Sequence, residues 1–124
     1  NHATQKAAVA VARKLAILLM KLWKSGETSD PFYQRKRDLF LDVIAGSRFK
    51  AIPAAGTYFQ MLDFSEISNE QDTLFAERLT KDHGIASIPT SVFNLEQRDF
   101  KMLRFCFAKE DHVLEHAGKI LSAI

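Results

Sequence analysis

One arginine lies within the most apolar stretch of the chain. Between Met102 and Ala108 every residue is apolar or aromatic except Arg104. A run this short and apolar predicts a strand with both faces largely covered. A guanidinium keeps its charge when it is buried, so its burial is costly without an anion beside it. We therefore expect a carboxylate to meet Arg104, either from the chain as a structural ion pair or from a ligand.

Other residues that could do chemistry form weaker patterns. His112 and His116 would share one helix face, but no third ligand and no metalloprotease motif accompany them, so we expect surface histidines and no metal site. Asp63 and Glu66 could act as an acid and a base, although solvated loop carboxylates are the simpler interpretation. Cys106 is the single cysteine, which excludes an internal disulfide, and we expect a buried, inert thiol.

Composition limits the class of protein. A chain of 124 residues, 47% of them hydrophobic and 26% charged, is typical of one soluble globular domain. The formal net charge of +2 gives no support to nucleic-acid binding over the whole chain. The charge is uneven, because no acidic residue precedes Glu27. The single cysteine fits a reducing compartment, and we expect a cytoplasmic protein.

The segment from Ala3 to Lys24 predicts a helix, since Gly26 is its first helix-breaking residue. Its amphipathic face consists of Ala8, Val11, Leu15, Leu18 and Leu22. Basic residues interrupt the apolar runs, which argues against a membrane span. We interpret it as a helix that packs on the domain or on a partner. A transit peptide and a membrane-surface helix are the alternatives, and nucleic-acid binding is disfavoured because stacking aromatics are lacking.

The remaining pattern predicts an α+β fold, with a small, mostly antiparallel sheet covered by helices. A linker at 25–31 divides residues 1–30 from a domain at 31–124. Within that domain we expect a solvated basic face at 35–38, an interruption of strand pairing at Pro89 and a helix cap at Asp111. The expected helices are 32–45, one that Ser68 or Asn69 caps and that runs through His83, and 112–124. The expected strands are 49–52, 57–63, 85–88 and 102–108.

Two resemblances bear on origin. Residues 1–8, 11–16 and 22–23 resemble the C-terminal tail of DEDD-type insertion-sequence transposases. That resemblance implies a transposase end joined to another gene, and it places no catalytic residue here. Because the chain begins with Asn1, we expect a fragment or a processed product.

Several motifs in order resemble a different family. They are residues 33–39 (YQRKRDL), 47–50 (SRFK), 56–59 (GTYF), 88–93 (IPTSVF) and 103–109 (LRFCFAK). From about residue 32 onward the chain resembles the C-terminal small domain of class I/II aminotransferases, the fold-type-I pyridoxal-phosphate enzymes, and within them the methionine and kynurenine group. The resemblance implies that Arg104 binds the α-carboxylate of an amino acid or 2-oxo acid. It places Gly56 and Tyr58 near the substrate entrance and Phe93 at the side-chain pocket, although core packing would also explain Tyr58 and Phe93.

The chain also departs from that family. The large domain would precede Phe32, and with it the Schiff-base lysine, the aspartate for the pyridinium nitrogen and the phosphate cup. We therefore expect no catalytic, cofactor-binding or metal-binding residue here, and no transamination by the chain alone. The predicted function is that of a substrate-carboxylate-binding small domain. The alternative is a non-catalytic protein that oligomerises through the first helix or an uncovered sheet face, with neither nucleic acid nor membrane as a partner.

Overall fold

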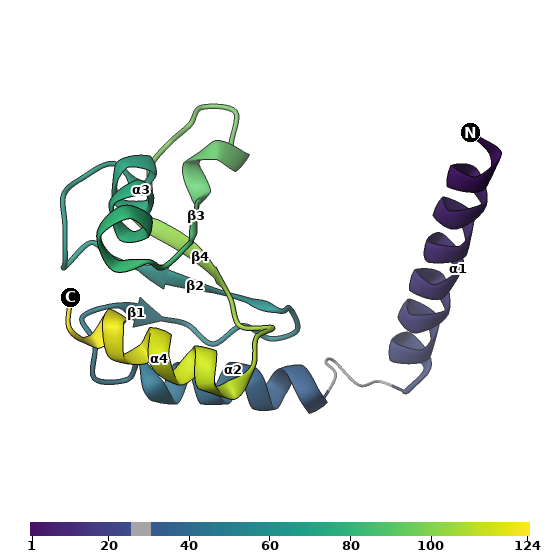
Figure 1. Ribbon diagram of the computed structural model, residues 1–124, viewed down its shortest axis with the longest axis horizontal. Helices are drawn as coiled ribbons and strands as arrows, with labels where there is room; N and C mark the ends of the chain where they lie inside the picture. The colour runs from purple at the N-terminus through teal and green to yellow at the C-terminus, as the bar shows by residue number, and fades with distance from the viewer. Residues whose placement is uncertain (26–30) are drawn as a thin grey trace.

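A computed structural model describes residues 1–25 and 31–124, and it leaves out the side chains of residues 18, 19 and 21–25 (Figure 1). The expected linker, with Gly26 as the helix stop, lies outside the described residues. So do the side chains of Leu18 and Leu22 on the expected amphipathic face.

The first segment is a helix, as predicted. Helix α1 covers His2–Ser25, and the side chain of Asn1 caps it by accepting a 3.0 Å hydrogen bond from Ala3 N–H at Oδ1. No helix in the described part of the chain is long and apolar enough to cross a membrane. The large apolar side chains described on α1 are all exposed: Val9, Val11, Leu15, Ile17 and Met20.

The second segment has the predicted α+β architecture. Its elements are α2 (Pro31–Val43), β1 (Lys50–Ala51), β2 (Phe59–Asp63), α3 (Asp72–His83), β3 (Ile88–Pro89), the 3₁₀ helix η1 (Thr90–Phe93), β4 (Met102–Cys106) and α4 (Asp111–Ser122). The four strands form one sheet in the order β1-β2-β4-β3, and every neighbouring pair is antiparallel. Pro89 lies on an edge strand, which is where a residue without an N–H is tolerated.

Alternation along the two central strands separates a core face from an outer face. On β4 Leu103 and Phe105 are buried, whereas Arg104 is half-buried and Cys106 is exposed. The core face packs against α2, α3 and α4, and α2 and α4 lie side by side (Figure 1). The largest fully buried apolar side chains are Leu62, Phe64, Phe75, Leu79, Leu103, Phe107 and Leu121.

Three local predictions are wrong. Cys106 is exposed because strand alternation turns it away from the core. Lys36, predicted to be solvated, is 6% exposed and pairs with Asp111. Asp111 does not cap α4, since Glu110 occupies the N-cap position without a side-chain bond.

Boundaries differ modestly from the prediction. Helix α3 begins at Asp72, with Gln71 at its N-cap in place of the expected Ser68 or Asn69. Ser68 Oγ accepts a hydrogen bond from Glu70 N–H and donates one to the Glu70 carboxylate. The helix ends as predicted at Gly84, whose φ of 69° is the left-handed conformation that glycine favours. The expected strand at 85–88 is reduced to Ile88–Pro89.

Candidate functional site

Arg104 occupies the middle of β4 on the outer face of the sheet. It lies opposite Met61 of β2 and Ile88 of β3 in the two antiparallel registers. Directly opposed residues in antiparallel strands project to the same face, so these side chains surround the arginine on its own side. The predicted orientation of Arg104, away from Leu103 and Phe105, is confirmed.

Two aromatic rings flank the guanidinium. Arg104 Cζ lies 4.7 Å from the ring centroid of Phe59 and 5.0 Å from that of Phe93. Phe59 comes from β2 and Phe93 from η1, so strand pairing and a separate loop helix build the site together. Rings at these distances attract a cation through their quadrupoles and also restrict where its plane can lie.

No carboxylate of the described residues reaches this guanidinium. Among them Arg104 makes no hydrogen bond and no ion pair, and its interactions are the two ring contacts. A guanidinium carries five N–H donors in a fixed planar fork that matches a carboxylate. The described part of the chain therefore leaves those donors available to an external anion.

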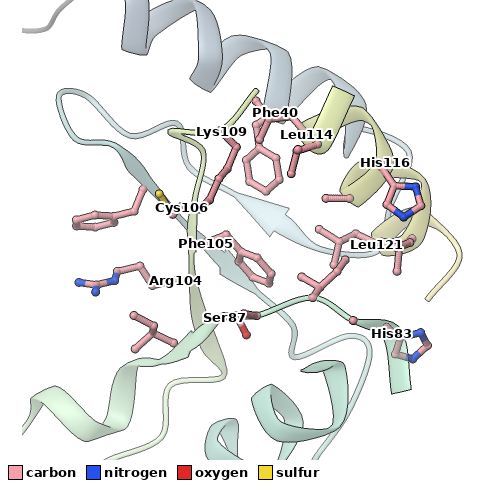
Figure 2. A pocket seen from close by; sticks show the side chains of 18 of the residues that line it. Phe40, His83, Ser87, Arg104, Phe105, Cys106, Lys109, Leu114, His116 and Leu121 are labelled. Atoms are coloured by element: carbon pink, nitrogen blue, oxygen red, sulfur yellow. The ribbon is translucent and has the colours of Figure 1, made fainter. Parts of the chain in front are cut away.

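A groove of about 590 Å³ is lined by residues from both faces of β4, with Phe105 on the core face and Arg104 and Cys106 on the outer face. Figure 2 shows Arg104 pointing to one side of the strand, with Phe40, Phe105, Leu114 and Leu121 on the other. The deep part of the groove is therefore apolar and belongs to the core side. Arg104 lines the groove from the outer face of the strand.

The structure brings some of the other predicted site residues close to Arg104 and leaves others apart. Phe93 contacts Arg104 directly. Tyr58 is one ring removed, because it packs edge-on against Phe59 with centroids 5.6 Å apart. Gly56 is not brought to the arginine and instead lines a separate small hollow beside Tyr33 and Arg37.

Sequence reasoning missed two contributors. Phe59 stacks on the guanidinium, and only the β2–β4 register identifies it, since its neighbour Tyr58 is equally aromatic. Asp72 is a buried acid, 1% exposed, that binds Ser91 in the helix carrying Phe93. The one feature of the sequence that could have identified Asp72 is its position, as an acidic residue near the start of a predicted helix. The described residues contain no cluster of three or more side chains that could hold a metal ion. His112 and His116 therefore have no third ligand among them.

A family model described as aminotransferase class I and II matches residues 1–121. The chain belongs to this family. Methionine aminotransferase of Escherichia coli K12 is 40% identical over 90 residues, which are 73% of this chain and 23% of that protein. Kynurenine–oxoglutarate transaminase 3 of Homo sapiens is 32% identical over 100 residues, covering 71% of this chain and 22% of the relative.

Solved structures of this aminotransferase family share the fold. The crystal structure of YbdL from Escherichia coli, whose reactivity identified a methionine aminotransferase function, matches with a TM-score of 0.72 at 39% identity, covering 75% of this chain and 24% of that one. N-succinyldiaminopimelate aminotransferase from Mycobacterium tuberculosis matches with a TM-score of 0.64 at 27% identity, covering 73% of this chain and 24% of that one. The chain thus spans less than a quarter of the length of these relatives.

Aminotransferases of this family use pyridoxal phosphate, act on amino and 2-oxo acids and assemble as oligomers. The described residues around Arg104 do not fit the cofactor by themselves. Among the described residues, the side chains opposite or stacked on Arg104 are Met61, Ile88, Phe59 and Phe93, none of which is a lysine. Lys109 lines the same groove as Arg104 but follows the end of β4. A guanidinium can bind a carboxylate or another anion through its N–H donors.

Proposed function

We propose that this chain is the substrate-carboxylate-binding small domain of a pyridoxal-phosphate-dependent amino acid aminotransferase and is inactive alone. Arg104 holds the α-carboxylate of an amino acid or 2-oxo acid. The observation that carries the proposal is a guanidinium flanked by Phe59 and Phe93 with no carboxylate partner among the described residues. Family membership supplies the substrate class, because the related proteins are named for amino acids.

The physical basis is a preoriented fork. Two rings limit the rotation of the Arg104 side chain, so less entropy is lost when a carboxylate binds. They also exclude water from the faces of the guanidinium while leaving its edge free for two parallel hydrogen bonds. Phe93 is 64% exposed and Tyr58 55% exposed, which leaves both rings available to the side chain of a bound substrate. Gly56 lies apart from these groups, and its role near the entrance stays a prediction.

The test is a titration of the ¹⁵N-labelled chain followed by NMR. The probe is 2-oxohexanoate, a 2-oxo acid with an apolar chain, and the matched ligand is 2-hexanone, which lacks the carboxylate. We expect 2-oxohexanoate to shift the signals of Arg104, Phe59 and Phe93, with millimolar affinity, and 2-hexanone to leave Arg104 Nε–H unchanged.

Variants give the matched control. Arg104→Gln should abolish the carboxylate-dependent shifts. Arg98→Gln should preserve them, because Arg98 also stacks on a ring, with Cζ 5.2 Å from the Phe100 centroid, but comes from the loop before β4. Equal responses to the two ligands, or binding that survives Arg104→Gln, would overturn the proposal.

A second candidate function is partner binding without catalysis, which the exposed apolar side chains of α1 favour. Val11 is 67% exposed and Leu15 55% exposed, and both belong to the predicted amphipathic face. A second copy of the chain is the expected partner. Sedimentation of the whole chain should then show an oligomer that Leu15→Glu dissociates and Lys14→Glu does not. A monomer at all concentrations would contradict this candidate.

A further inference from the structure

The buried carboxylate of Asp72 does not contact Arg104 itself but binds the helix that carries Phe93. Asp72, the first residue of α3, is 1% exposed, and both of its oxygens bind Ser91. Ser91 N–H donates to Asp72 Oδ2 at 2.8 Å, and Ser91 Oγ donates to Asp72 Oδ1 at 2.7 Å. A buried carboxylate with two donors from one residue strongly fixes the position of that residue.

Ser91 belongs to the first turn of η1, whose backbone N–H groups lack partners within the helix. Asp72 satisfies one of these donors from a distant element, as a capping side chain does within a helix. A second bond ties η1 to the sheet, because Thr90 Oγ1 donates to Met102 O at 3.1 Å. Helix η1 is thus fastened between α3 and β4.

Asp72 is itself held in place. Its backbone N–H donates to Asp99 Oδ2 at 3.1 Å, and Lys101 Nζ donates to the same oxygen at 2.8 Å. Burial would raise the pKa of Asp99, but the bonds from Lys101 and from the Asp72 backbone outweigh it and lower that pKa below its usual value. Asp99 therefore stays ionised at neutral pH, and the start of α3 is anchored to the loop that enters β4.

The hydrogen bonds from Asp72 to η1 bear on Arg104 through Phe93. Phe93 follows Ser91 by two residues in η1, is 64% exposed, and lies 5.0 Å from Arg104 Cζ. A ring this exposed has little packing of its own to hold it, so its placement depends on the anchoring of η1. We propose that Asp72 is a positioning residue that holds η1 so that Phe93 covers the Arg104 guanidinium. This inference rests on the proposed function of Arg104.

The substitution that probes it most directly is Asp72→Asn. The amide oxygen can still accept from Ser91 N–H, but the amide NH2 can only donate to Ser91 Oγ. Both contacts therefore lose their ionised acceptor, and the hydroxyl bond must reverse its direction. Helix η1 should loosen and Phe93 should leave the guanidinium, with Phe59 remaining. Losing one ring contact should weaken 2-oxohexanoate binding about two- to fivefold.

The experiment has a readout that needs no ligand. The Arg104 Nε–H signal of the whole chain is shifted by the ring current of Phe93, and Phe93→Leu defines the value without that ring. Asp72→Asn should move this signal toward the Phe93→Leu value. Ser91→Ala, which removes the hydroxyl bond and keeps the backbone bond, should move it part of the way. Asp82→Asn, an exposed acid near the end of the same helix, should leave it unchanged.

A double-mutant cycle separates positioning from general stability. In the Phe93→Leu background, Asp72→Asn should cause no further loss of 2-oxohexanoate affinity, because the ring it positions is already absent. An undiminished further loss, or an unshifted Arg104 signal in both Asp72→Asn and Ser91→Ala, would overturn the inference. If the unmodified chain does not bind 2-oxohexanoate, the proposed function fails, while the ligand-free Arg104 signal still decides whether Asp72 positions Phe93.

Discussion

Lys36 Nζ on α2 donates a 2.6 Å hydrogen bond to Asp111 Oδ1 at the start of α4. Arg35 adds two bonds to the same carboxylate, at 3.0 and 3.1 Å. The Lys36 side chain is 7% exposed and that of Asp111 is 45% exposed, so the acid is the solvent-facing partner of an almost buried cation. Removing Asp111 would leave the ammonium of Lys36 without this anion, which is costlier than losing a surface pair.

We expect the stability of the domain to depend on pH through this carboxylate. The hydrogen bonds from Arg35 and then Lys36 lower the pKa of Asp111 from 3.8 to about 2. The folded state therefore binds this proton less readily than the unfolded state, so the stabilisation is complete above about pH 5 and declines as the pH falls toward 2. Urea unfolding of the wild type and Asp111→Asn should differ at pH 7, and the difference should shrink between pH 4 and pH 2.

The matched control for that series is Asp38→Asn. Asp38 pairs with Arg37 but is 65% exposed, so its substitution should change stability little at any pH. A wild-type advantage over Asp111→Asn that stays constant down to pH 2 would contradict the assignment.

Close approach of α2 and α4 predicts that Gly118→Ala is destabilising. A Cβ built at Gly118 would lie 2.6 Å from both Cβ and Cγ2 of Val43 and 3.0 Å from its carbonyl oxygen. Overpacking of this kind costs about 1–3 kcal/mol, while the better helix propensity of alanine returns about 1 kcal/mol. Denaturant titration should therefore show a net loss. Gly46→Ala, where a Cβ meets nothing within 4 Å, should be nearly neutral, and equal effects of the two would contradict the packing argument.

We expect Arg104→Ala to preserve the fold. The residue is half-buried and, among the described residues, has no carboxylate that its loss would orphan, so the free energy of unfolding should fall by less than about 1 kcal/mol. Phe105→Ala, one position along the strand on the core face, should cost about 3–5 kcal/mol. A loss at Arg104 as large as the loss at Phe105 would show a structural role.

We expect no specific covalent attachment of pyridoxal phosphate to the chain alone, since none of the described side chains opposite or stacked on Arg104 is a lysine. Incubation with the cofactor, borohydride reduction and peptide mass mapping should show only scattered, substoichiometric labelling. A single lysine labelled stoichiometrically would sink this expectation and the inactivity of the isolated chain with it.

Local patterns predicted much of the fold because each element has its own periodicity. Gly84 closes α3 and alternation turns Arg104 outward, both as expected. Pro89 is the last residue of a two-residue edge strand, which agrees with the expected interruption of strand pairing there. Hydrophobic composition predicts a buried Cys106, whereas strand alternation turns its side chain away from the core.

Long-range partners could not be predicted. Lys36 contacts Asp111, and Asp72 contacts Ser91, only in the folded chain. No local sequence pattern around one residue of either pair indicates its partner. The outward direction of the Arg104 side chain followed from the sequence, but its contact with Phe59 required the strand register.

The origin of α1 stays a prediction. The aminotransferase model takes in residues 1–121 and so includes this helix, whereas the E. coli and human relatives cover 73% and 71% of the chain. The resemblance of residues 1–30 to a transposase tail is therefore untested. The division at residue 30 is equally a prediction.

The two-residue edge strands have a consequence for behaviour at high concentration. The central strands β2 and β4 are five residues long and would template cross-chain pairing if their edges were free. Instead β1 borders β2 with Lys50, which binds Glu66, and β3 borders β4 with Pro89, which has no N–H to offer another strand. Short edge strands that carry a lysine or a proline disfavour the addition of another chain to the sheet.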